Sequence, residues 1–97
     1  MKYAQGDIIA IELVTDRIVI GTINKTYSDM SVEMRFPISL DYDGEKIIMM
    51  PYSPVSKQEV LIFSPAAIIT SYYVDEEVQE AYLTIEKQKG TKPENLN

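Results

Sequence analysis

Three clustered carboxylates are the first residues of this sequence whose types suggest chemistry. Asp41, Asp43 and Glu45 flank Gly44, and carboxylate oxygens are the ligands that calcium prefers. The EF-hand spacing and its later bidentate glutamate are absent. An Asp-Gly pair between apolar runs is also a strong hairpin signal. The pattern therefore favours a hairpin turn over a calcium loop.

The sequence contains no histidine and no cysteine. This removes the commonest general base, thiolate catalysis, disulfides and zinc-thiolate sites together. No triad, P-loop or pair of carboxylates has catalytic spacing. We therefore predict a non-enzymatic protein with no catalytic residues, no metal site and no cofactor.

Tyrosines could provide a different chemistry, the stacking of nucleic-acid bases. They could equally fill a subunit interface or a barrel rim, where an amphipathic ring suits one dry and one wet end. The residues concerned are Tyr27, Tyr42, Tyr52, Tyr72 and Tyr73.

Two other groups of residues allow either a binding or a structural interpretation. The methionines at 30, 34, 49 and 50 could form an adaptable binding surface, although their alternation favours core packing. Glu76, Glu77 and Glu80 could form an acidic interaction face or simply the solvated side of a helix.

Length and charge limit the classes of function. Ninety-seven residues suffice for one domain. The net charge of −6 is spread along the whole chain, which argues against broad phosphate neutralisation. No secretory segment follows Met1, and no apolar run approaches the roughly 20 residues of a membrane span. We expect a cytoplasmic protein without membrane contacts.

Alternating apolar residues predict the strands that position these groups. Runs at 7–14 and 17–25 read as two antiparallel strands, and a third begins with Met30, Val32 and Met34 on one face. The second run is apolar on both faces, which predicts a central strand. Gly21 within it indicates a bend, a bulge or a close backbone approach. The three strands should curl toward a small barrel.

The remaining strands follow the same logic. Pro37 cannot donate to a sheet, so we expect solvent or a bulge there. A hairpin is predicted around Gly44, then a proline loop at 51–56. Apolar strands are expected at 59–63 and 67–74, separated by Ser64-Pro65.

A change to helical spacing predicts a C-terminal helix over 75–89. Val74, Val78, Ala81, Tyr82 and Ile85 lie on one helical face. Start and stop signals agree, with the N-cap expected at residue 75 and the C-cap glycine at residue 90. The domain should therefore span 1–90, with a disordered tail at 91–97.

This order of elements resembles the Sm and Sm-like (LSm) family. The first family motif is matched by a glycine-centred strand followed by a methionine-bearing one: Val19 or Ile20, Gly21, Ile23, Met30, Val32 and Met34. The second motif is similar to Val60–Ile68, with Ser64-Pro65 at its break. The resemblance implies a mainly β fold, a strongly bent five-stranded antiparallel open barrel, here with a C-terminal helix.

The same resemblance implies an RNA pocket, but its positions are altered here. The matching residues are Asp29, Ser31, Ser64, Pro65 and, at the acidic position, Tyr27. An aspartate has no π-face for a base and repels phosphate, and serine cannot make the bidentate pair of an amide.

Two cations, Lys25 and Arg35, are the expected phosphate contacts in such a pocket. A face that gathers them with Arg17 or Lys46 would favour RNA. A negative assembly would favour a protein partner.

Members of the family form rings in which one subunit's fourth strand pairs with the next subunit's fifth. Pairing around a ring satisfies both free edges of a short barrel. We predict a homo-oligomeric ring of roughly five to seven subunits, with Val60, Ile62, Ile68 and Tyr72 in the interface. Small acidic members of this type resemble those of bacteriophages.

Two functions follow. The first is a ring-forming Sm-like subunit that binds RNA or a ribonucleoprotein through a modified surface. The alternative is an acidic oligomeric scaffold that binds a protein partner and has lost RNA binding.

Overall fold

The computed structural model describes residues 3–53 and 59–95. Parts of the expected lead-in, of the proline loop at 51–56 and of the C-terminal tail lie outside these residues. The elements are β1 (Ile8–Leu13), β2 (Ile18–Thr26), β3 (Val32–Tyr42), β4 (Ile47–Pro51), β5 (Val60–Phe63), the 3-10 turn η1 (Pro65–Ala67), β6 (Ile68–Tyr73) and α1 (Glu76–Asn95).

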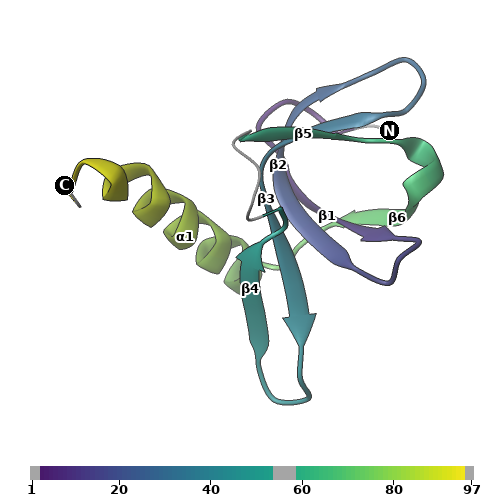
Figure 1. The fold of residues 1–97 in the computed structure, drawn as a ribbon. Coiled ribbons are helices and arrows are strands. Elements are labelled where there is room, and N and C mark those ends of the chain that lie inside the picture. The colour runs from purple at the N-terminus through teal and green to yellow at the C-terminus, as the bar shows by residue number, and fades with distance from the viewer. Residues whose placement is uncertain (1–2, 54–58, 96–97) are drawn as a thin grey trace.

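The strands form one antiparallel sheet that curls without closing (Figure 1). Its order is β4-β3-β2-β1-β6, and β5 pairs with the other half of β3. The expected mainly β open barrel with a C-terminal helix is confirmed. Six strands replace the expected five, because the long strand β3 has two short partners along one edge.

A bulge at Phe36–Pro37 divides β3 into two halves. Ile20 pairs with Ile38, whereas Thr22 pairs with Arg35, so β3 carries an extra residue at this point. Phe36 has a positive φ of 53° and donates its amide to Glu59 O at 2.8 Å. Of the two alternatives predicted at Pro37, solvent exposure or a bulge, the structure shows the bulge. The bulge directs one half of β3 toward β5 and the other toward β4.

The third strand begins later than predicted. Met30 has a φ of 75° and lies in the turn before β3, with its side chain exposed. It therefore does not share a face with Val32 and Met34, which are fully buried. Apolar residues alternate through the turn as well as through the strand. Alternation alone therefore does not show where the turn ends and the strand begins.

The main core lies inside the curl of the sheet. Its buried members come from β1, β2, β3 and β5: Ile9, Ile11, Leu13, Val19, Ile23, Val32, Met34 and Phe63. Gly21 provides the close approach expected of it, since an added Cβ would lie 2.9 Å from Met34 Sδ.

A second core joins α1 to the outer side of the sheet. Tyr82 is fully buried and packs with Ile20 and Ile38, and Val78 and Ile85 pack around them. The predicted helical face is thus confirmed, apart from Ala81, which is exposed. Asp75 caps the helix as expected, because its carboxylate accepts the Val78 amide at 3.1 Å.

The helix continues to Asn95, beyond the end predicted at residue 89. Gly90 and Pro93 are poor helix formers, and proline adds no N–H to the backbone ladder, which is why the sequence pattern predicts an earlier end. The helix end predicted at residue 89, with its C-cap at Gly90, is wrong, whereas the tail predicted at 91–97 stays a prediction. The far half of α1 points away from the barrel (Figure 1).

Candidate functional site

The β2–β3 turn holds three of the residues that the family resemblance places in an RNA pocket: Tyr27, Asp29 and Ser31. Tyr27 N donates to Ser31 O at 3.0 Å, and Met30 N donates to Tyr27 O at 2.9 Å. The Asp29 carboxylate accepts the Ser31 amide at 2.9 Å. Together with the positive φ of Met30, these bonds hold a three-residue hairpin loop in one conformation.

This turn lines a shallow hollow of about 410 Å³ with β5. The lining residues are Tyr27, Ser28, Asp29, Ser31 and Ile62. One predicted interface residue, Ile62, thus lies beside three predicted pocket residues. The hollow combines one apolar side chain with hydroxyl groups and a carboxylate.

Ser64 and Pro65 lie close to the same end of the barrel. Val32 pairs with Phe63, so the register places Ser31 opposite Ser64 just beyond the paired residues. The Ser64 hydroxyl accepts the Ala66 amide at 3.2 Å and begins η1. Its hydroxyl serves the local turn, and proline at the next position has no N–H to offer a ligand.

Two carboxylates make this end of the barrel negative. Glu33 accepts hydrogen bonds from the Tyr27 hydroxyl, at 2.5 Å, and from the Asn24 amide. The bond from Tyr27, followed by that from Asn24, lowers the pKa of Glu33, and the same bond raises the pKa of Tyr27. The Ser31 amide likewise lowers the pKa of Asp29. Both acids are therefore ionised at neutral pH.

Lys25 lies beside this turn. Its Nζ lies 4.9 Å from the centre of the Tyr27 ring, in a cation–π arrangement. The lysine therefore covers one face of the ring that could otherwise stack a base. Sequence reasoning missed Asn24 and Glu33. Glu33 pairs with Lys25, but Asn24 is the extra residue where the β2–β3 register shifts between Ile23 and Lys25, and strand alternation does not reveal such a bulge.

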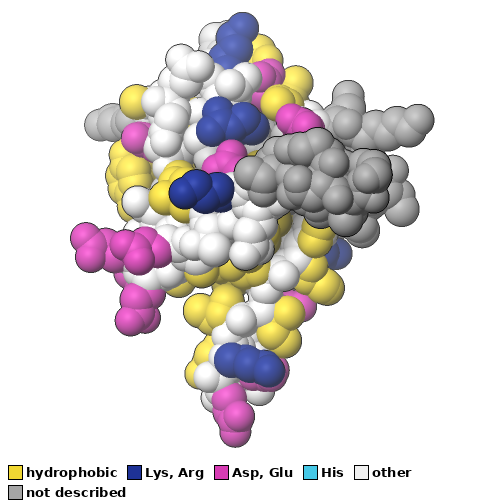
Figure 2. Space-filling model, turned by 90° about the vertical axis from the view of Figure 1, so that its left-hand side faces the viewer, with side chains coloured by type: hydrophobic (Ala, Val, Ile, Leu, Met, Phe, Trp, Pro, Cys, Tyr) yellow, Lys and Arg dark blue, Asp and Glu magenta, His cyan; other side chains and the backbone are white. Residues whose placement is uncertain are grey.

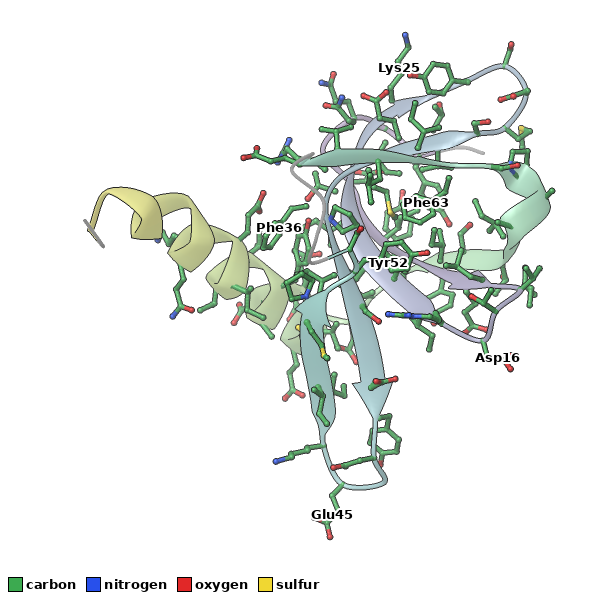
Figure 3. All side chains as sticks on the ribbon, viewed as in Figure 1. Asp16, Lys25, Phe36, Glu45, Tyr52 and Phe63 are labelled. Carbon is green, nitrogen blue, oxygen red and sulfur yellow. The ribbon has the colours of Figure 1, made fainter. Side chains whose placement is uncertain are left out.

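The other predicted phosphate contact lies elsewhere. Arg35 is at the β3 bulge, where its Nε lies 3.4 Å from Glu86 Oε2 of α1. Arg17 donates to Ser39 Oγ at 3.0 Å and lies over the Tyr52 ring. Figure 3 shows Lys25 and Glu45, next to Lys46, at opposite ends of the molecule.

The described cations therefore do not form one cluster. Figure 2 shows lysine and arginine side chains spaced singly over one side, with acidic groups between them.

The predicted interface residues are divided between surface and core. Ile62 and Tyr72 are exposed, and Val60 is half-buried. Ile68 was predicted in the interface, but it packs against the main core. The alternation of β6 instead turns Ile69 and Tyr73 to solvent, and each is 62% exposed. Had Ile68 been assigned to the core face, strand alternation would have placed Ile69 on the exposed face.

Other classes of site find no support in residues 3–53 and 59–95. Within them, no group of three or more acidic side chains is placed to hold a metal ion. Asp43 instead accepts the Glu45 and Lys46 amides at 3.0 Å, which confirms the predicted hairpin turn. No described helix combines the length and the apolarity that crossing a membrane requires.

Comparisons with known proteins support the fold. No family model and no curated protein sequence matches the chain. One similar solved structure is a chain of the NatC complex bound to CoA, with a TM-score of 0.51 and 16% identity over 84% of this chain and 99% of that one. Another is a chain of the NatC complex bound to Gag peptide and CoA, with a TM-score of 0.51 and 17% identity over 78% and 92%. At these identities the likeness shows a shared fold alone, a small open β-barrel.

Proposed function

We propose that this chain is a non-enzymatic Sm-like assembly subunit that works in the cytoplasm and binds proteins, including copies of itself, through β5 and β6. The observation that carries this proposal is the apolar character of two sheet edges. Within the described residues, β5 pairs only with β3 and β6 only with β1. Ile62, Ile69 and Tyr73 on these strands are at least 59% exposed.

Edges of this kind gain by pairing. A free edge leaves backbone N–H and C=O groups without strand partners, and apolar side chains beside it favour association. Burying apolar surface contributes about 25 cal/mol per Å². In such an assembly β5 of one subunit pairs with β6 of the next. Because these are two different surfaces, the contact is heterologous, and the assembly is closed only when the subunits form a ring. We infer a ring of roughly five to seven copies.

Charge favours proteins over RNA as the main partners. The chain carries −6 overall, and the Tyr27–Ser31 turn adds ionised Asp29 beside Glu33. Phosphate contacts need gathered cations. The two similar solved structures are themselves chains of a protein complex, which supports a role in protein assembly.

RNA binding at the Tyr27–Ser31 turn is the second candidate function. It is supported by the gathering of Tyr27, Asp29, Ser31 and the Ser64–Pro65 turn at one end of the barrel. Lys25 would supply the phosphate contact if it left the Tyr27 ring. Asp29 opposes this function, because it repels phosphate.

The mass of the assembly in solution tests the main proposal. Native mass spectrometry and sedimentation velocity should give a multiple of the 11.0 kDa chain. Ile62→Lys and Ile69→Lys should each shift the population to single subunits, because each buries a charge in the paired edges. Val14→Lys is the matched control, since Val14 is 58% exposed but lies outside both edges. A wild-type protein that stays single at tens of micromolar contradicts the proposal.

The same preparations separate the second candidate. Fluorescence polarisation with uridine-rich and adenine-rich RNA at 150 mM salt should show no binding at micromolar protein. Binding that Lys25→Ala weakens would support the RNA function instead. Binding that survives this change would place RNA away from the Tyr27–Ser31 turn.

A further inference from the structure

The β3–β4 hairpin forms an arm that projects from the barrel (Figure 1). We call residues 40–51 the arm. Tyr42 pairs with Ile47 and Asp41 with Ile48, and only the base, at Leu40 and Met49, packs against the α1 core. A two-stranded ribbon alone is marginally stable in water. Its sequence is nevertheless apolar, which calls for a physical reason.

Large apolar side chains line both faces of the arm. Tyr42, Ile47, Ile48 and Met50 are between 39% and 68% exposed. Figure 2 shows hydrophobic side chains along the projection and charged ones at its end. Exposed apolar residues in such density mark an interaction surface.

The outer edge of β4 is free among residues 3–53 and 59–95, where β4 pairs only with β3. Tyr52 N donates to Pro37 O at 3.1 Å, and Asp43 N donates to Lys46 O at 3.2 Å. Antiparallel ladders alternate between bonded and non-bonded pairs, so Ile48 and Met50 bond to β3. The amides of Ile47 and Met49 therefore point outward, ready for another strand.

The arm ends in a fixed, negatively charged turn. Asp41, Asp43 and Glu45 lie around a single cation, Lys46. The Asp43 carboxylate accepts two turn amides, and the Tyr42 hydroxyl donates to Gly44 O at 3.1 Å. Gly44 has a φ of 97°, which glycine adopts at low cost. The edge is thus preorganised, and its charge selects a cationic occupant.

We propose that the free edge of β4 binds an extended segment of a partner protein in which lysine or arginine alternates with apolar residues. The segment adds to the sheet as a further strand. Its backbone bonds to Ile47 and Met49, and its apolar side chains lie on the face of the paired Tyr42 and Ile47. Its cations lie on the opposite face, where their apolar stems cover Ile48 and their charged ends reach Asp41, the partner of Ile48. A second copy is the poorer occupant, because each chain carries −6. This site is separate from the β5 and β6 edges.

Peptide titration with a backbone-specific variant tests the proposal. The probe is a fluorescein-labelled nine-residue peptide that alternates lysine with valine, and its control carries glutamate in place of lysine. Ile47→Pro removes one outward N–H without breaking the β3 ladder, and proline is tolerated at the first residue of an edge strand. It should weaken binding roughly tenfold. Ile47→Thr retains the N–H and should weaken binding about threefold or less.

Amide exchange locates the contact. In the free protein, Ile48 and Met50 should exchange slowly and Ile47 and Met49 quickly, and the lysine peptide should protect the latter pair. The double variant Asp41→Asn, Glu45→Gln should weaken binding severalfold and reduce its salt dependence. It leaves the turn-forming Asp43 in place.

Several results would overturn the proposal. These are no binding of the lysine peptide, equal binding of the glutamate peptide, and equal affinities for Ile47→Pro and Ile47→Thr. Protection of Ile47 and Met49 without peptide, in a sample whose mass exceeds one chain, would show that a second copy occupies the edge. Urea unfolding of each variant confirms that the comparison is made on folded protein.

Discussion

At the scale of single residues, Gly21 is the position where one side chain decides whether β2 and β3 fit. An added Cβ would lie 2.9 Å from Met34 Sδ and 3.2 Å from Met34 Cβ. The sulfur can move, but the Cβ is fixed to the β3 backbone. We expect Gly21→Ala to lower the free energy of unfolding by roughly 1–3 kcal/mol, measured by urea titration.

The cause of that loss can be isolated with a double-mutant cycle. Met34→Ala removes both the sulfur and the rest of the crowding side chain beyond Cβ, so it should relieve part of the clash in the Gly21→Ala background. The cost of the double variant should fall short of the summed single costs by about 1 kcal/mol. Strict additivity would show that Gly21 matters for chain flexibility alone.

Other residue-scale features were only partly visible in the sequence. Gly21 was identified because glycine inside a strand pattern is costly without a reason. Met30 was misplaced because its side chain has a strand's spacing while its backbone has a positive φ. Nothing in a methionine signals that conformation, which asparagine or glycine would have indicated.

At the scale of elements, Tyr82 fixes α1 to the sheet. Its hydroxyl accepts from Thr22 Oγ1 at 3.0 Å and shares its single proton between the carbonyls of Arg35 and Phe36, each at 3.0 Å. The latter two belong to the β3 bulge. Tyr82→Phe should lower the free energy of unfolding by about 1–3 kcal/mol, since it leaves these groups without their partner. Tyr72→Phe, whose hydroxyl bonds to Glu12 near the surface, should change it by about 0.5 kcal/mol or less.

The same residue gives the fold a dependence on alkaline pH. Burial is the main cause that raises the pKa of Tyr82 from 10.0 to about 12. Between these values the unfolded chain releases the proton while the folded chain keeps it, so stability falls as pH rises. The difference in unfolding free energy between wild type and Tyr82→Phe should therefore narrow from pH 10 to pH 12. A constant difference would mean that Tyr82 ionises alike in both states.

Most elements were predictable because their signals are local. Apolar alternation located the strands, Asp-Gly located the hairpin, and Asp75 with its helical face located the start of α1. The sequence did not show that β4 and β5 share one edge of β3. That arrangement depends on which strand pairs with each half of β3 on either side of its bulge. The end of α1 was missed because Gly90 and Pro93 disfavour a helix without excluding it.

At the scale of the whole molecule, the candidate site is assembled by the register in which β3 pairs with β5. The sequence predicted the part of the site that lies in one turn. The sequence placed Tyr27, Asp29 and Ser31 in one turn, and the β3–β5 register brings Ser64 opposite them. The charge distribution was not predictable to the same extent. Lys25 and Arg35 are ten positions apart in sequence, yet one covers a tyrosine ring and the other pairs with a helix. Such partners depend on tertiary packing.

Net charge also sets how an assembly of this chain should respond to salt. Each subunit carries −6, and the radius of gyration is 13.4 Å, so neighbouring subunits lie within the Debye length of about 30 Å at 0.01 M salt. At 0.1 M the length falls to about 10 Å, and the repulsion is largely screened. Sedimentation equilibrium should therefore show assembly strengthening severalfold over this range, whereas phosphate binding weakens with salt. Assembly that weakens instead would mean that ion pairs across the interface outweigh the repulsion between whole subunits.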